Sequence, residues 1–513
     1  MTSADSRPDR TLAQRSPCSS RWLFDRLPAA LAVIVGAAAM IIYSVGQWRS
    51  MQVPSWDLAI FSELAKAYSH LQAPIVPIKG EGYNLLGDHF HPLLVLLGPV
   101  WRLFPTPLAL LVVQDLLLAV SAWPLTRLAT RLLNRPVAAL LGLFYVLSWG
   151  FQGAVAAQFH EIAFAVPLLA WASVAFVERR WRSCAWWLAP LVLVKEDLGL
   201  TVFMAGLAIA LRGLQGAPQQ PTPRGPNWWR RLGTTRLGFA VALFGLLAFL
   251  LTVLVFLPLL SPSNTWEYGL SDDGASAGLL SRLFSPEVKL ATLGMLMYTA
   301  GGIGLASPWM ALVLPTLAWR FLSGNEFYWG WQNWHYNAIL MPIALGALLD
   351  VVARLKARGT EANPATAPQT PASGRRAAPV WARLTVALGV VVPLAAGVGT
   401  ARDLPLWSLT QPGFGAASWR AQAAAEVSDV IPDGASVETD LGLLAYLVPD
   451  HTVYWVGTST VDTDYVVVDS SSSAWGGNPP ADAAAWASER SATGATYELV
   501  LDTGGYQVAR RAS

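Results

Sequence analysis

Long apolar runs separated by short polar connections dominate the chain. Eleven such runs recur, at roughly 29–48, 106–126, 137–151, 161–178, 183–195, 197–211, 237–259, 289–305, 306–321, 338–352 and 381–401. A helix needs about 20 apolar residues to cross the hydrocarbon of a bilayer, so the shorter runs must tilt, extend into loops or be partly re-entrant. The pattern predicts an all-α polytopic membrane protein whose transmembrane domain, residues 29–401, has about 11 helices.

Composition and charge restrict the class of protein to which this chain can belong. The chain is 54% hydrophobic and 13% charged, with a mean hydropathy of +0.41, which excludes an ordinary soluble globule. The net charge of +2 comes from Lys and Arg at predicted helix ends, so we expect no nucleic-acid partner. The two cysteines, Cys18 and Cys184, support neither a disulfide framework nor a thiolate metal site.

The distribution of basic residues orients the predicted helices. Most of the 35 Lys and Arg residues fall in the tail 1–28 and in the other segments that share its side of the membrane. The opposite side, up to residue 337, holds only Arg49, Lys66, Lys79, Arg102, Lys195, Arg282, Lys289 and Arg320. The positive-inside rule therefore predicts a cytoplasmic N-terminus in the plasma membrane, with the first helix retained as an anchor. An odd number of helices then puts the C-terminus outside.

The connections differ in composition. Segments 213–236 and 357–380 are rich in Pro, Gly, Ala, Thr and Arg, which is typical of flexible linkers, here on the cytoplasmic side. The longer outer loops are expected at 49–92, 260–288 and 322–337.

Residues 402–513 have a different pattern. Their apolar runs are short, and a helix-like AQAAAEVSDVI is followed by the strand-like segments SVETD, TVYWVG and DYVVVD. An Asp433-Gly434 pair provides a turn before the first of these strands. This segment predicts a small extracytoplasmic α/β domain with a short βαβ-type layer.

Titratable side chains gather at the predicted outer ends of the helices. They are Asp57, Asp88, His89, His91, His160, Glu161, Lys195, Glu196, Asp197 and His335. A charged group beside hydrocarbon costs about 3 kcal/mol or more unless it is paired or hydrated. The set is therefore our candidate active site.

Asp57 carries the sharpest signal. A helix over residues 56–71 would place on one apolar stripe Trp56, Ile60, Phe61, Leu64, Tyr68 and Leu71. Asp57 falls inside this stripe, and a carboxylate facing an apolar surface is either satisfied by a cation or a helix N-terminus or acquires, by desolvation, the raised pKa that a general base near neutral pH requires. Alternatively, Asp57 follows Pro54 and Ser55 and only complements the dipole at a helix N-terminus.

The run Gly87-Asp88-His89-Phe90-His91-Pro92 lies farther along the same outer loop. His89 and His91 alternate, so in an extended segment they share a face and could bind one metal or one phosphate. A loop that simply stays hydrated at the membrane surface would accept the same residues.

Two outer turns add further charges. One turn carries His160-Glu161, and the next carries Lys195-Glu196-Asp197 between two closely spaced helices. Lys195 could bind an anionic lipid headgroup beside a carboxylate, or it could merely neutralise Glu196 or Asp197 in a local ion pair.

The outer segment 327–337 is dense in aromatic and amide side chains and includes His335 and Tyr336. Most of its Trp and Tyr side chains fit the aromatic belt at a membrane surface. Alternatively, these side chains bind a sugar, because aromatic rings pack against the face of a sugar ring and amide groups hydrogen-bond to its hydroxyls.

Five segments together resemble a known family. SWDLAIFSEL, GDHFHPLLVLLGPVW, QFHEIAFAVPLLA, LVKEDLGL and WHYNAILMP occur in the order and separations of the membrane proteins grouped as domain of unknown function 2079, over roughly residues 50–350. That family is similar in layout to the GT-C membrane glycosyltransferases. The resemblance implies many helices, a catalytic acid in the first outer loop, an outer C-terminal domain and a polyprenyl-phosphate sugar as donor.

The same resemblance suggests residue roles. Asp57 matches the acid that deprotonates the acceptor hydroxyl, and Asp88 is the second candidate. Lys195, His89 and His335 would hold the phosphate that leaves with the lipid.

The resemblance leaves the cofactor open. Trp56-Asp57-Leu58 lacks the adjacent acidic pair of better-known relatives, so a divalent metal is neither required nor excluded. Our first hypothesis is an inverting transfer from a polyprenyl-phosphate sugar, in the membrane lipid, to an acceptor glycan, lipid or protein. The alternatives are a transporter or lipid flippase, or a non-catalytic scaffold of the cell envelope.

Overall fold

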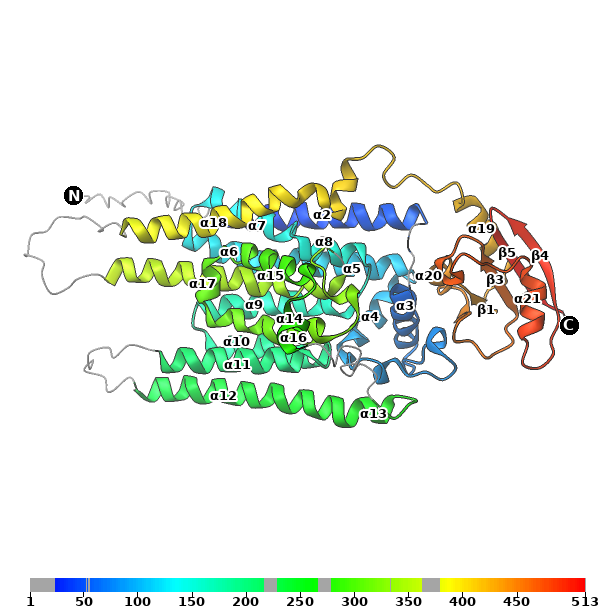
Figure 1. The fold of residues 1–513 in the computed structure, drawn as a ribbon, viewed down its shortest axis with the longest axis horizontal. Helices are drawn as coiled ribbons and strands as arrows, with labels where there is room; N and C mark the ends of the chain where they lie inside the picture. The colour runs from blue at the N-terminus through cyan, green and yellow to red at the C-terminus, as the bar shows by residue number, and fades with distance from the viewer. Residues whose placement is uncertain are drawn as a thin grey trace, which may run out of the picture.

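The computed structural model describes residues 24–512 except 52, 54–55, 216–227, 266–277, 333 and 362–378. A long bundle of helices carries a small sheet domain at one end (Figure 1). The predicted fold class, a helical membrane domain with a C-terminal α/β domain, is confirmed.

The helices of the bundle follow the predicted apolar runs. They are α2 (Leu27–Arg49), α3 (Trp56–Ser69), α4 (Leu97–Leu103), α5 (Pro107–Val120), α6 (Ala122–Leu132), α7 (Arg135–Val146), α8 (Trp149–Ala156), α9 (Ala165–Val177), α10 (Trp181–Leu188), α11 (Leu198–Leu214), α12 (Trp228–Leu251), α13 (Leu257–Leu260), α14 (Leu279–Phe284), α15 (Glu287–Thr299), α16 (Leu314–Leu322), α17 (Leu340–Glu361) and α18 (Val380–Thr400).

Within the described residues, 6 helical stretches are long and apolar enough to cross a membrane, and the shorter apolar helices are Pro92–Leu103, Glu161–Val177 and Leu198–Leu214. Two boundaries differ from the sequence prediction. Residues 228–236, expected in a flexible loop, belong to α12, and α17 continues to Glu361. Most of the remainder of both expected loops lies outside the described residues.

Glycines hold α11 and α12 close together. Gly206 of α11 faces α12 so closely that an added Cβ would lie 2.3 Å from the backbone nitrogen of Ala242. Gly199, one heptad earlier, faces Gly245 in the same way, with 2.8 Å from its Cβ position to the Gly245 oxygen. Small residues at this spacing let membrane helices approach to backbone contact.

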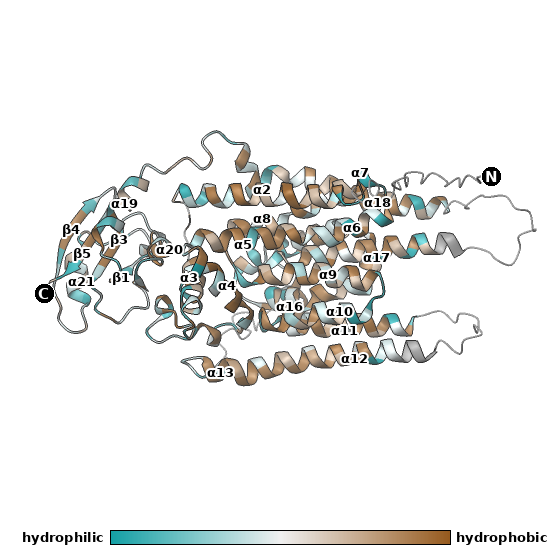
Figure 2. Cartoon of the chain, turned by 180° about the vertical axis from the view of Figure 1, so that it is seen from behind, coloured by the Kyte–Doolittle hydropathy of each residue, from teal (hydrophilic) through white to brown (hydrophobic). Residues whose placement is uncertain are grey.

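Burial separates central helices from peripheral ones. Of the apolar window in α17, 83% is buried inside the protein, whereas for α18 the share is 17%. Figure 2 shows hydrophobic colour along most of α12. These helices therefore present apolar side chains outward, as lipid contact requires.

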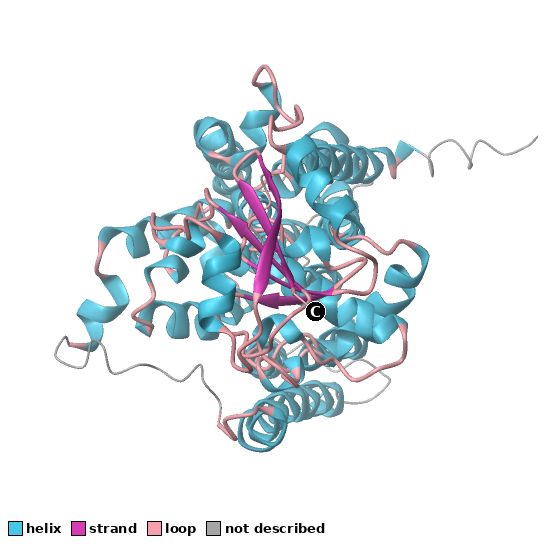
Figure 3. Ribbon diagram, turned by 90° about the vertical axis from the view of Figure 1, so that its right-hand side faces the viewer, coloured by secondary structure: helices cyan, strands magenta, loops and turns pink. Residues whose placement is uncertain are grey.

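The C-terminal domain is built on five strands, β1 (Ser436–Thr439), β2 (Thr452–Trp455), β3 (Tyr465–Asp469), β4 (Tyr497–Thr503) and β5 (Tyr506–Arg511). Their order in the sheet is β2-β1-β3-β5-β4. β1 pairs in parallel with β2 and β3, and α20 (Leu444–Leu447) connects β1 to β2 as predicted. The antiparallel β4–β5 hairpin was not predicted. Seen end-on, the sheet lies over the helical bundle (Figure 3).

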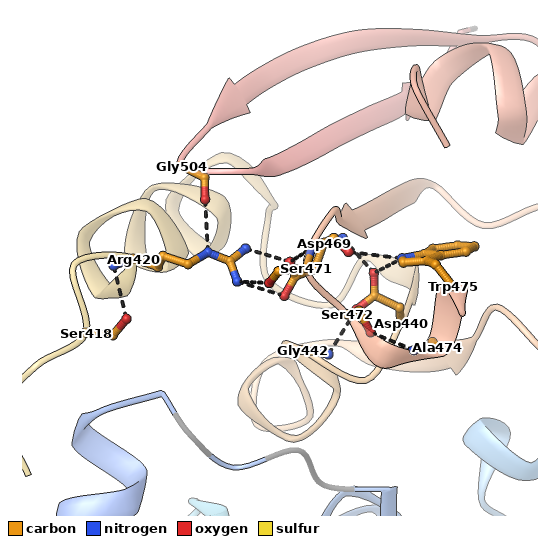
Figure 4. Close-up of polar contacts among 10 residues, drawn as sticks. All are labelled: Ser418, Arg420, Asp440, Gly442, Asp469, Ser471, Ser472, Ala474, Trp475 and Gly504. Atoms are coloured by element: carbon orange, nitrogen blue, oxygen red, sulfur yellow. Dashed lines mark hydrogen bonds and ion pairs between the residues drawn. The ribbon is translucent and has the colours of Figure 1, made fainter. Parts of the chain in front are cut away.

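A buried polar network closes the carboxyl edge of β1 and β3 (Figure 4). Arg420, just before α19 (Ala421–Val430), donates to both carboxylate oxygens of Asp469 at 3.2 and 2.6 Å. Asp440 accepts from the backbone nitrogens of Asp469 and Gly442 and from Nε1 of Trp475. Both carboxylates already have protein donors, so this network stabilises the domain.

The C-terminal domain contacts α3 directly. Glu63 accepts a hydrogen bond from the backbone nitrogen of Val453 at 3.3 Å, and Lys66 donates to the Val448 oxygen at 2.6 Å. The rings of Trp56 and Trp455 meet edge to face at 4.5 Å between centroids. The domain therefore fixes the helix that carries Asp57.

Candidate active site

One pocket of about 750 Å³ opens beside α3 at the end of the bundle that faces the C-terminal domain. Its lining includes every candidate residue from the sequence: Asp57, Asp88, His89, His91, His160, Glu161, Lys195, Glu196, Asp197, His335 and Tyr336. Four segments far apart in the chain thus meet at one place. Their chemical roles stay predictions.

Asp57 lies in the first turn of α3, where its side chain is 40% exposed. Its Oδ2 is 3.3 Å from Nε2 of His160, whose own side chain is only 3% exposed. The expected apolar stripe is only partly correct, because α3 ends at Ser69 and Leu71 beyond it is 95% exposed. Asp57 is thus near a helix N-terminus, as the alternative reading requires, and it also lines the pocket; its role as a base stays a prediction.

Gln114 of α5 positions His160. Its Oε1 accepts from the backbone nitrogen of His160 at 3.0 Å, and its Nε2 donates to the Gln158 oxygen at 2.8 Å. Nδ1 of His160 lies 3.1 Å from the same Gln158 oxygen. A carbonyl can only accept, so Nδ1 carries a hydrogen and Nε2 is the nitrogen directed at Asp57. Gln158 has a left-handed φ of 73°, a strained conformation often found at functional sites.

A second strained turn delivers His335. Trp334 has a φ of 61°, and the following His335 ring stacks on His160 with 3.5 Å between centroids. Fully buried Arg320 holds this segment by donating to Oδ1 of Asn337 at 2.9 Å. The two histidines therefore come from loops held by buried polar contacts, which fixes their orientation.

Lys195 pairs with Glu161 rather than with its chain neighbours. Its Nζ is 2.7 Å from Oε1 of Glu161, and both side chains are buried. The expectation that Lys195 neutralises Glu196 or Asp197 locally is wrong, because the chain folds a carboxylate 34 residues away against it.

His89 and His91 have different surroundings. Nδ1 of His89 is 2.8 Å from Oε1 of Glu196. Burial and Lys195 oppose protonation, but ionised Glu196 outweighs them and raises the pKa of His89 above its usual value. His91 is 1% exposed and packs edge-on to Phe61, and burial lowers its pKa to about 4. One is thus suited to carry charge near neutral pH, the other to stay neutral.

Lys79 is a charged pocket residue that the sequence did not single out as part of the site. Its Nζ lies 3.2 Å from Oδ2 of Asp88, whose Oδ1 accepts a hydrogen bond from the Tyr83 hydroxyl at 3.2 Å. A lone lysine in a loop carries no distinguishing pattern, and its separation of nine positions from Asp88 gave no signal of the pair.

The pocket carboxylates each face a donor or cation. The pairs are Asp57 with His160, Asp88 with Lys79, Glu161 with Lys195, Glu196 with His89, and Asp197 with Trp319. Burial raises the pKa of Asp197 to about 6. Among the described residues, no group of three or more His, Cys, Asp or Glu side chains could hold a metal ion. The described residues around the pocket therefore do not fit a metal site.

Aromatic rings form the remaining walls. Trp319 of α16 lies edge-on to Tyr328 and Tyr336, with 5.1 and 5.9 Å between centroids, and all three line the pocket. Phe249 of α12 adds an apolar wall from a lipid-facing helix. Charged, aromatic and apolar surfaces are thus present in one cavity, which suits a ligand with both a polar head and an apolar chain.

Fold and pocket define a multi-pass membrane protein with a polar site beneath its C-terminal domain. Residues 47–513 match the family described as "Predicted membrane protein (DUF2079)". The chain therefore belongs to this family, as its motifs predicted.

Two solved structures are similar to the chain at low identity and with TM-scores below 0.5. The crystal structure of ArnT from Cupriavidus metallidurans bound to undecaprenyl phosphate is 14% identical, with a TM-score of 0.49 over 96% of this chain and 98% of that one. The Archaeoglobus fulgidus oligosaccharyltransferase tethered to an acceptor peptide is 11% identical, with a TM-score of 0.40 over 94% and 74%. No curated protein matches the chain.

Proposed function

We propose that this protein is a membrane glycosyltransferase that moves a sugar from a polyprenyl-phosphate donor to an acceptor at the outer membrane face. The observation that carries the proposal is the contact of 3.3 Å between Asp57 and His160 inside a polar pocket beside lipid-facing helices. The pocket lies at one end of the bundle rather than halfway along it, which favours surface chemistry over transport through the bundle.

Asp57 is the base in this proposal. Since Nδ1 of His160 donates to the Gln158 oxygen, a neutral His160 would turn a lone pair toward Oδ2 of Asp57. With a hydrogen on Nε2, His160 would instead donate toward Oδ2 of Asp57 and orient its carboxylate. His160 is a positioning residue, and the accessible carboxylate of Asp57 takes the proton.

The reaction is then a single displacement. An acceptor oxygen forms a bond to the anomeric carbon while the bond from that carbon to the phosphate oxygen breaks, and its electron pair leaves with the lipid phosphate. The acceptor proton passes to Asp57. Attack from the side opposite the leaving group inverts the anomeric centre.

Cations at the pocket would stabilise the leaving phosphate. Nζ of Lys195 carries three donors, of which Glu161 engages one, and Lys79 and His89 line the same cavity. Cationic donors near the leaving oxygen offset the charge that develops there. Trp319, Tyr328 and the other ring walls would pack on the sugar or the first isoprene units.

The test is sugar transfer by purified protein in lipid vesicles, with a panel of labelled polyprenyl-phosphate sugars. Undecaprenyl carriers come first, since that lipid is named in the ArnT structure. Asp57→Asn should lower kcat at least about a hundredfold. His160→Gln should cost less and should also shift the pH profile of kcat, which a purely structural residue would not do. Asp429→Asn, an exposed acid on α19, is the matched control.

Equal turnover by wild type and Asp57→Asn would remove Asp57 from the mechanism. Net movement of labelled lipid across the vesicle without transfer would instead support a flippase.

A further inference from the structure

A second groove lies at the opposite end of the bundle, away from the C-terminal domain. It has a volume of about 370 Å³ and is lined by residues from α7, α17 and α18, which lie together toward the N-terminal end in Figure 1. Apolar side chains such as Val137, Val386 and Val390 form most of it, and two cations, Lys356 and Arg383, lie at its wall.

Among the residues that the structure describes, no acid forms an ion pair with either of these two cations. The carboxylates described near this end already face arginines: Asp25 with Arg135, Glu178 with Arg131 and Arg180, and Asp350 with Arg212 and Arg354. Lys356 makes no ion pair among the described side chains and donates only to the Leu132 backbone oxygen. Arg383 is exposed and has no ion pair within the described part of the chain.

The side of the groove is open to lipid. Leu384, Leu388 and Val391 of α18 are 65%, 61% and 57% exposed. An apolar surface of this extent on a membrane helix is covered by acyl chains. Basic pockets between helices at a membrane surface bind anionic headgroups, because phosphate oxygens satisfy both the charge and the N–H donors.

We propose that this groove binds one anionic phospholipid of the inner leaflet. The phosphate lies between Lys356 and Arg383, and an acyl chain runs along Val386, Val390 and Val391. The lipid completes the contact between α18, a peripheral helix, and the inner ends of α7 and α17. This site is separate from the pocket at Asp57, so it stands whether or not the proposed transfer reaction is correct.

The test is lipid retention measured by native mass spectrometry after reconstitution in vesicles of phosphatidylcholine mixed with phosphatidylglycerol. Wild type should retain one phosphatidylglycerol in preference to phosphatidylcholine. The double variant Lys356→Gln/Arg383→Gln should bind it roughly thirtyfold more weakly, at about fivefold for each cation lost. Arg179→Gln/Arg180→Gln removes the same charge from the same end and should retain the lipid.

A third variant tests the groove without removing either cation, so that loss of lipid can be separated from misfolding of the double variant. Val390→Trp fills the groove and keeps both cations, so it too should lose the bound lipid while the protein remains folded. Equal retention by the Lys356→Gln/Arg383→Gln variant and wild type, or equal loss in both double variants, would overturn the proposal in favour of no site or of general charge attraction. Phosphatidylglycerol retained by Val390→Trp would also overturn it.

Discussion

Glu63 makes the contact between α3 and the C-terminal domain sensitive to pH. It is 6% exposed, and its carboxylate accepts from the backbone nitrogen of Val453 at 3.3 Å. Burial raises its pKa from 4.5 to about 7, although Lys66 and the Val453 hydrogen bond both act in the opposite direction. Near pH 7 and above, folding therefore keeps an ionised carboxylate out of water.

The sign and size of the effect follow from this shift. Between about pH 4.5 and about pH 7 the folded protein binds more protons at Glu63 than the unfolded chain does, so the free energy of unfolding falls as pH rises through this window. At about 1.4 kcal/mol per pKa unit, the whole shift corresponds to about 3 kcal/mol. Glu63→Gln keeps an acceptor for Val453 and removes the titration.

The assay is thermal unfolding of wild type and Glu63→Gln in lipid nanodiscs from about pH 4.5 to about pH 8, together with amide hydrogen exchange at residues 448–453. Wild type should lose stability and protection in this interface as pH rises, and the difference from Glu63→Gln should level off above about pH 7. Glu489→Gln, an exposed acid on α21 (Ala483–Arg490), should follow the wild-type curve. The reasoning would be refuted if the stability of wild type and Glu63→Gln changed with pH in parallel, or if wild type became more stable relative to the variant as pH rises.

Two further predictions concern packing and the outer domain. Gly206→Val should destabilise the α11–α12 pair by about 1–3 kcal/mol or more, because its Cβ would lie 2.3 Å from the Ala242 nitrogen. Gly233→Val, where the Cβ would meet nothing within 4 Å, is the control in the same thermal unfolding assay, and equal losses would contradict the close contact. Arg420→Ala should cost about 3–5 kcal/mol because it leaves buried Asp469 without its cation. Amide exchange in β3 should report this loss, and no change there would show that Asp469 is satisfied without Arg420.

The apolar pattern predicted the helical segments because the bilayer imposes a local requirement. Each crossing segment must satisfy its own backbone hydrogen bonds and present apolar side chains, so runs such as 29–48 and 381–401 appear as α2 and α18. Alternation of helix direction then placed the charged turns at one end. The strands around Val437, Val453 and Val467 could also be predicted from the sequence, since their apolar runs are short and bounded by turns.

Which side chains pair with one another in the site could not be predicted from the apolar pattern. Lys195 meets Glu161 and Asp57 meets His160 because of how the helices rotate and pack, which depends on side chains distant in the chain. Contacts between α3 and the C-terminal domain join residues 390 positions apart, as with Glu63 and Val453.

The sequence by itself determined the class of this protein, its helical segments, its C-terminal α/β domain and the end of the bundle at which its titratable groups collect, because each depends on local hydrophobicity and chain direction. Only the tertiary structure decided which carboxylate meets which cation, that Lys79 joins the pocket, and that the C-terminal domain holds α3. Those outcomes depend on long-range packing, and a polar side chain in the sequence is compatible with many partners until the fold selects one.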